Sequence, residues 1–61
     1  MIMLHGPYNG RVIYIDAVQV VAVEAFMDYF EHSIVHLDGG AAIEVREYAS
    51  QVHRLLEQER R

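Results

Sequence analysis

The sequence contains neither cysteine nor lysine, and it is only 61 residues long. Without cysteine the chain forms no disulfide and no thiolate metal site. A domain of this size buries only about 60% of the surface that its unfolded chain exposes, so small domains often depend on a disulfide, a metal or a partner subunit. Because 52% of the residues are hydrophobic, we expect a homo-oligomer, or another protein, to cover part of that surface. A compact monomer with a few exposed valines is the alternative.

Basic residues are also absent from the centre of the chain, where no arginine lies between Val12 and Val45. Nucleic-acid affinity depends on clustered Lys and Arg, so direct nucleic-acid binding is not favoured. The net charge is −4, and an acidic centre attracts a basic protein surface or simply keeps a small apolar protein soluble. The acidic residues of this span are Asp16, Glu24, Asp28, Glu31, Asp38 and Glu44.

Long apolar runs are missing as well. The first apolar run stops at Gly6, and no later run approaches the roughly 20 residues of a membrane-spanning helix. We therefore expect a single small domain, residues 1–61, that does not insert into a membrane. The lack of cysteine is consistent with a cytoplasmic location.

Two hairpins are predicted from turn chemistry. Strands at 2–5 and 11–15 flank a turn that contains Asn9-Gly10, and Asn-Gly supplies the positive φ of tight turns. Strands at 33–37 and 42–46 flank Asp38-Gly39-Gly40-Ala41. The second hairpin shows period-two alternation, because Ile43 and Val45 share one face while Glu44 and Arg46 share the other.

The C-terminal region predicts a helix, since Tyr48, Val52, Leu55 and Leu56 follow helical spacing. We expect this helix to pack on one face of the strands. The predicted core comprises Val35, Leu37, Ile43, Val45, Val52, Leu55 and Leu56.

The stretch from Asp16 to His32 is compatible with two structures. Asp16 and Gln19 form a capping-box pattern, and an apolar stripe follows at helical spacing. Four valines and Phe26 lower the helix propensity, however, and Val20 and Val23 lie off the stripe. We favour a turn and strand over 16–26 and an exposed loop at 27–32. The expected fold is α+β, a small antiparallel β-meander of three to five strands with a C-terminal helix; a helical Asp16–Glu31, in a ββαββα order, is the alternative.

The chain contains short motifs along nearly its whole length, namely Met1-Ile2, Leu4, Asn9-Gly10-Arg11, Asp16, Val23-Glu24, Ile34-Val35-His36-Leu37, Asp38-Gly39, Val45-Arg46-Glu47, Val52 and Leu55-Leu56. In order and spacing these motifs resemble a known family, the small bacterial flagellar protein FlbD, also called SwrD. The resemblance implies a turn and a strand over 16–26 and a flagellar accessory role. That family has no ascribed enzyme activity, and it tends to begin its helix with a serine where this chain has Tyr48.

A second set of motifs comprises Val23-Glu24-Ala25, Asp28-Tyr29, 35–39 and Val45-Arg46. This set partly resembles the early strands of the LytTR DNA-binding domain. The chain covers only about half of such a domain and lacks the later part that carries much of the DNA contact. The resemblance therefore supports the strand at 16–26, and DNA binding is not carried over.

Catalytic and metal-binding patterns are weak. His32 and His36 are four residues apart, a zinc-chelating spacing on a helix, but no third ligand stands at a fixed distance. Ser33 and Ser50 lie in no nucleophile motif, and neither glycine-containing turn has the spacing of a phosphate loop. We expect no enzyme activity, no catalytic residue, no cofactor and no metal site.

The remaining candidate is an interaction surface, because aromatic residues and Met are enriched at interface cores. We expect a non-enzymatic protein-interaction or regulatory module, in a flagellar context if the family resemblance holds. One alternative is an acidic inhibitor, for instance one encoded by a phage, that docks on a basic nucleic-acid-binding protein. Another is a small transcriptional regulator. The candidate surface comprises Met27, Asp28, Tyr29, Phe30, Glu31, Glu24 and Asp38.

Overall fold

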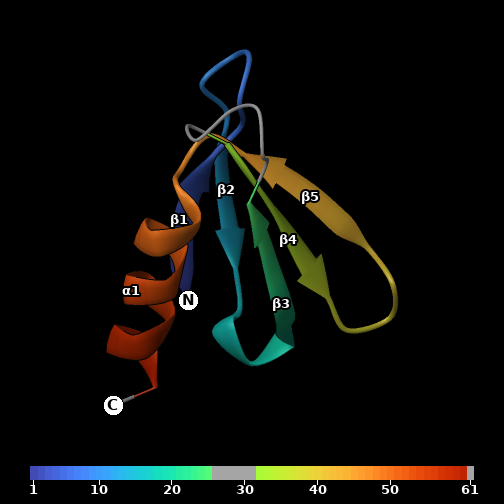
Figure 1. Cartoon of the computed structure of the whole chain (residues 1–61), viewed down its shortest axis with the longest axis vertical. Helices are drawn as coiled ribbons and strands as arrows, with labels where there is room; N and C mark the ends of the chain where they lie inside the picture. The colour runs from blue at the N-terminus through green and yellow to red at the C-terminus, as the bar shows by residue number, and fades with distance from the viewer. Residues whose placement is uncertain (26–31, 61) are drawn as a thin grey trace.

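The computed structural model describes residues 1–25 and 32–60. These residues form five strands, one short 3-10 turn and one helix (Figure 1). The predicted α+β class, with consecutive antiparallel strands and a C-terminal helix, is confirmed. The strands are divided between a two-stranded and a three-stranded sheet. In chain order the elements are β1 (Ile2–His5), β2 (Val12–Ile15), η1 (Ala17–Gln19), β3 (Val20–Ala25), β4 (Ser33–Leu37), β5 (Ala42–Val45) and α1 (Ala49–Glu59).

The first hairpin pairs β1 with β2 in antiparallel register, with Met3 opposite Tyr14 and Leu4 opposite Ile13. Gly10 has a φ of 67°, as the Asn-Gly signal predicts. The Asn9 side chain accepts a hydrogen bond from the Arg11 backbone N–H at 3.1 Å, which holds the end of the turn. The turn therefore sets the register that sends Leu4 into the core.

Residues 16–25 form a turn and a strand, so the predicted strand is confirmed as far as Ala25 and the helical alternative is wrong for this part of the chain. Asp16 does act as a cap: its Oδ1 accepts from Val18 N at 3.3 Å, but only a single 3-10 turn follows. The valine-rich stretch then extends, because β-branched side chains suit a strand better than a helix. Phe26 lies outside the described residues.

The larger sheet has the order β3-β4-β5, and both pairings are antiparallel. The Asp38-Gly39-Gly40 turn joins β4 to β5, with φ values of 94° at Gly39 and 96° at Gly40 that favour glycine. The β3–β4 register shifts between Val20 and Ala22, where β3 has an irregularity. This shift determines which residues of β3 lie beside each residue of β4.

One hydrophobic core joins both sheets to the helix. Four of the seven predicted core residues are buried, namely Val35, Val45, Val52 and Leu56, and the other three, Leu37, Ile43 and Leu55, pack against them partly buried. Buried residues that the prediction omitted are Ile2, Leu4, Ile15, Ala17 and Val20. The first hairpin is therefore as much a part of the core as the predicted strands.

The helix α1 contacts β1 and β3, and Figure 1 shows it lying beside β1. A backbone hydrogen bond of 2.8 Å from Arg46 N to His5 O connects the segment after β5 to the end of β1. At the other end of the strands, Asp38 N donates to Gln19 O at 2.7 Å. With the inner sides of both sheets committed to the core, their outer sides remain available for contacts.

Candidate functional site

The outer side of the three-stranded sheet presents two rows of residues. Glu24 lies opposite Ile34, and Ile34 lies opposite Glu44, so one row places an isoleucine between two carboxylates. The next row consists of Ala22, His36 and Ala42. In β4 and β5 the neighbours of these residues, such as Val35 and Val45, point into the core. We name these six outward residues the acidic face.

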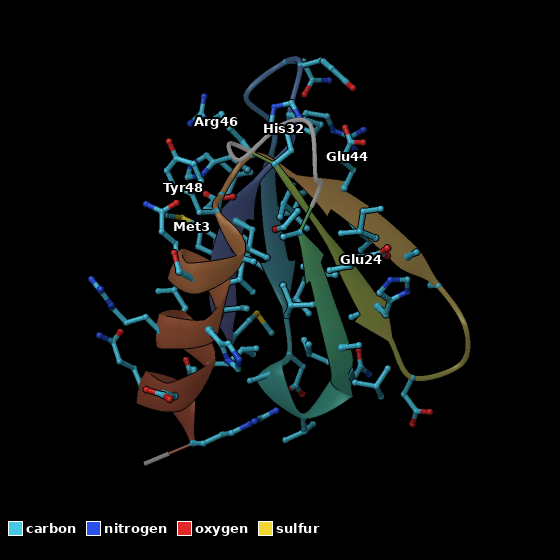
Figure 2. All side chains as sticks on the ribbon, in the orientation of Figure 1. Met3, Glu24, His32, Glu44, Arg46 and Tyr48 are labelled. Atoms are coloured by element: carbon cyan, nitrogen blue, oxygen red, sulfur yellow. The ribbon has the colours of Figure 1, made fainter. Side chains whose placement is uncertain are left out.

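The acidic face combines an apolar centre with charged edges. Ile34 and Glu44 are half-buried, whereas Glu24 is exposed. His36 Nε2 lies 3.0 Å from Glu24 Oε1, a diagonal contact between neighbouring strands. The flanking residues Ala22 and Ala42 are small, so they leave Ile34 and His36 accessible. Figure 2 shows Glu24 and Glu44 on the same side of the molecule, away from Met3 and Tyr48.

The structure brings together only part of the predicted interaction surface. Glu24 belongs to the acidic face, but Asp38 follows the opposite end of β4, in the turn to β5. Asp38 lies four positions beyond Ile34, which is about 13 Å at the usual rise per residue of a strand. The other predicted members, Met27, Asp28, Tyr29, Phe30 and Glu31, lie outside the described residues. Glu44, which the prediction did not include in the surface, is placed beside Ile34 by the β4–β5 register.

A second cluster lies where β1 meets the start of the helix. Glu47 Oε1 accepts the His5 backbone N–H at 2.9 Å, and Glu47 Oε2 lies 2.6 Å from His5 Nδ1. Because a carboxylate only accepts hydrogen bonds, the His5 Nδ1 carries the proton. Burial acts to raise the pKa of Glu47, but these hydrogen bonds and the charge of His5 outweigh it and hold that pKa below its ordinary value.

An open pocket of about 380 Å³ adjoins this pair and is lined by Arg46, Tyr48 and Gln51 together with His5 and Glu47. A histidine held by a carboxylate is one part of a nucleophile–base arrangement. Ser33 does not complete it, because this residue is fully buried and its hydroxyl donates to the Glu47 backbone carbonyl at 2.9 Å. The contacts of His5, Glu47 and Ser33 thus tie three segments of the fold together.

The two histidines with zinc-chelating spacing do not share a site. His36 lies on the acidic face beside Glu24, whereas His32 precedes β4 and its ring meets Tyr8 edge to face at 5.9 Å. Among residues 1–25 and 32–60, no group of three or more His, Cys, Asp or Glu side chains is arranged to hold a metal ion.

No protein-family model, no curated protein and no solved structure matches this chain. The resemblances to the FlbD family and to the LytTR strands therefore stay predictions from the sequence. Within the described part of the chain, no helix has both the length and the apolar character needed to cross a membrane.

Proposed function

We propose that the chain is a cytoplasmic, non-enzymatic protein-interaction module that docks a basic protein partner through its acidic face. The observation that carries this proposal is the row Glu24–Ile34–Glu44, in which the sheet register aligns two carboxylates on either side of an isoleucine. Interfaces commonly have an apolar centre with a polar rim, and this row has that arrangement on a small scale.

The charge distribution favours a basic partner. No arginine lies between Val12 and Val45, so the strands that build the acidic face contribute no positive side chain to it. Opposite charge on a partner would steer the encounter and fix its orientation more than it would increase affinity. Exposed ion pairs contribute only about 0.2–1 kcal/mol each, so Ile34 is expected to supply much of the binding free energy.

The test is capture of partners by the affinity-tagged chain, followed by identification and affinity measurement. We compare the native chain with the double variant Glu24→Gln, Glu44→Gln and with the control Glu57→Gln on an exposed position of α1. A basic partner should bind the native chain and the control equally, bind the double variant about two- to thirty-fold more weakly, and lose affinity with rising salt. A partner whose binding is insensitive to the double variant and to salt would contradict the proposal.

The resemblance to FlbD supports a flagellar setting for this interaction. Deletion of the gene in a flagellated host should then impair swimming, and expression of the native chain should restore it. Normal swimming of the deletion strain would contradict the flagellar role. It would not affect the proposal of docking on a basic partner, which the capture experiment tests separately.

An inhibitor of a nucleic-acid-binding protein uses the same acidic face, because a row of carboxylates competes with phosphates for basic residues. In that case the captured partner should release its nucleic acid when the chain is added. A transcriptional regulator that binds DNA itself is less favoured, since Glu24 and Glu44 would repel the phosphate backbone. A low-salt gel shift with random-sequence DNA tests this function directly.

A further inference from the structure

The strand β5 is an edge of the three-stranded sheet, because β4 is its one strand neighbour among the described residues. Figure 1 shows β5 on the side of this sheet that is remote from α1. The other edge strand, β3, contacts α1 and has the register irregularity between Val20 and Ala22. An edge strand carries backbone N–H and C=O groups with which another strand can pair. The free side of β5 is therefore the edge where an added strand would pair most regularly.

The hydrogen bonds show which backbone groups of β5 face outward. The carbonyl of Ala41, just before β5, accepts a hydrogen bond from β4 at 2.8 Å. In an antiparallel pair these directions alternate from residue to residue, so Ala42 and Glu44 turn their backbone groups away from β4. Arg46 has the same direction, because its N–H donates to His5 O at 2.8 Å. In the part of the chain that the structure describes, the outward groups of Ala42 and Glu44 have no backbone partner.

An open groove of about 230 Å³ lies beside this edge. It is lined by Ile43 and Glu44 of β5 and by 6–9, Arg11 and Ile13 of the first hairpin. Ile13 and Ile43 pack against the core and give the groove an apolar part. Arg11 forms no ion pair with Glu44 among the described residues. The Glu44 carboxylate therefore stays available to a partner.

An added antiparallel strand would continue both features of this edge. Its residue opposite Glu44 lies on the same face of the sheet as Glu44, so it extends the row of two carboxylates and an isoleucine by one position. A basic residue at that position has a carboxylate beside it, and the small side chain of Ala42 leaves room for another. The next residue of the added strand points to the other side, where Ile43 and Ile13 provide apolar contact.

Charge distinguishes between two occupants of this edge. A second copy of the chain would bring its own β5, which carries Glu44 and no positive side chain, and two chains of net charge −4 repel each other. A charged residue on an edge strand is one of the features by which proteins prevent such self-pairing. A segment that alternates basic and apolar residues meets complementary groups on both of its sides instead.

From these relationships we infer that the basic partner docks by strand addition, in which an extended segment of alternating basic and apolar residues pairs antiparallel with the free edge of β5. The backbone groups of Ala42 and Glu44 hold the segment, and the Glu44 carboxylate selects a basic residue. The inference rests on the proposed function, because it uses the same acidic face, and it adds the conformation of the bound segment. Since only two residues of the edge are open, the segment alone is expected to bind weakly, with a dissociation constant of about 0.1–1 mM.

The test is a nuclear magnetic resonance titration of the whole chain with a capped peptide of about seven residues that alternates arginine and valine. The amide signals of Ala42 and Glu44 should shift, and at saturation their hydrogen exchange should slow at least about tenfold. In the paired strand the arginine N–H groups face β5 and the valine N–H groups face away. N-methylation of the arginines should therefore weaken binding at least about tenfold, whereas N-methylation of the valines, the matched control, should change it less than about threefold.

A variant of the chain tests the same edge from the other side. Ala42→Pro removes the outward N–H and should weaken peptide binding at least about tenfold, whereas Ala42→Ser keeps that N–H and should bind like the native chain. Proline is tolerated on an edge strand where the N–H faces solvent, as it does at Ala42. Thermal unfolding establishes that the variant is folded, and the two N-methylated peptides test the inference without any change in the protein.

Absence of binding at millimolar peptide, or equal binding of the two N-methylated peptides, would overturn strand addition. Equal binding of these peptides that is nevertheless weakened by the double variant Glu24→Gln, Glu44→Gln would overturn strand addition alone and support docking on the acidic face. A dimer of the chain by itself that Ala42→Pro dissociates would assign this edge to a second copy and also overturn the inference.

Discussion

His5 and Glu47 lie 42 positions apart in the sequence, yet they share two hydrogen bonds, of 2.9 Å to the His5 backbone N–H and 2.6 Å to its ring. The backbone carbonyl of Glu47 also accepts the hydroxyl of buried Ser33. Glu47 therefore connects the end of β1 and the start of β4 to the segment just before α1. Together with the Arg46 N to His5 O hydrogen bond and the shared core, this side chain holds the first hairpin against the rest of the molecule.

Glu47→Gln should lower the free energy of unfolding by about 1–2 kcal/mol at neutral pH, because hydrogen bonds to a charged acceptor are lost. The pKa of Glu47 is lowered in the folded state, so its stabilisation is present above the ordinary value of 4.5 and is lost as the pH falls through the lowered folded pKa. Urea unfolding at a series of pH values measures the difference between the two proteins, which should shrink below pH 4.5.

The control for this pH dependence is Glu57→Gln. Glu57 is exposed on α1, and within the described residues its side chain forms no hydrogen bond or ion pair. Its substitution should change stability by less than about 0.5 kcal/mol at any pH. If Glu47→Gln and Glu57→Gln gave parallel curves, the hydrogen-bonded connection between Glu47 and His5 would contribute nothing measurable to folding.

Neighbouring residues of β1 should differ sharply in their effect on stability. Leu4 is fully buried in the core, so Leu4→Ala is expected to cost about 2–5 kcal/mol through lost burial and the cavity that remains. Met3 projects outward, and Met3→Ala should cost less than about 1 kcal/mol in dilute monomeric protein. Denaturant midpoints of the two variants measure the contrast, and equal losses would contradict the assigned faces of β1.

Local signals in the sequence predicted most of the secondary structure. The glycine turns at Asn9-Gly10 and at 38–41 determine where each hairpin reverses, and the positive φ values at Gly10, Gly39 and Gly40 show why glycine stands there. Alternation in 43–46 correctly identified Val45 as a core residue. These features depend on neighbours within a few positions, which is why sequence reasoning reaches them.

The inward face of the first hairpin was harder to predict. In β2 the outward residues Val12 and Tyr14 are as apolar as the inward Ile13 and Ile15, so no alternation indicates which face is buried. The same composition leaves Val12 and Tyr14 exposed on the outer side of the hairpin. The ambiguity in the sequence and the exposed patch in the structure thus have one cause.

The candidate site depended on tertiary register and was predicted only in part. Glu24 and Glu44 are 20 positions apart in the sequence. They lie in one row only because Ile34 pairs with Glu24 of β3 on one side and with Glu44 of β5 on the other. The register shift at 20–22 changes which residue of β3 lies opposite each residue of β4. No local sequence pattern predicts that shift. The His5–Glu47 contact also depends on tertiary structure, since it joins the end of β1 to the segment that follows β5.

The helix α1 begins with an incomplete capping arrangement. The Gln51 side chain accepts the Tyr48 backbone N–H at 2.8 Å, which is one of the two bonds of a capping box. The Tyr48 side chain makes no capping hydrogen bond to the described helix Ala49–Glu59, although its φ of −64° and ψ of 151° suit an N-cap residue. One backbone N–H in the first turn therefore lacks the side-chain acceptor that serine would provide.

Tyr48→Ser should complete this capping box, because the serine hydroxyl reaches the Gln51 backbone N–H from the backbone geometry that Tyr48 already has. A favourable N-cap contributes about 0.5–2 kcal/mol relative to alanine, so Tyr48→Ser should be more stable than Tyr48→Ala by that amount. Both variants lose the half-exposed Tyr48 ring, so the effect of that loss on stability cancels when they are compared with each other. Thermal and urea unfolding measure the difference. Equal stability of the two variants would show that the first turn of α1 obtains its hydrogen bonds from water, and that Gln51 alone suffices to begin the helix.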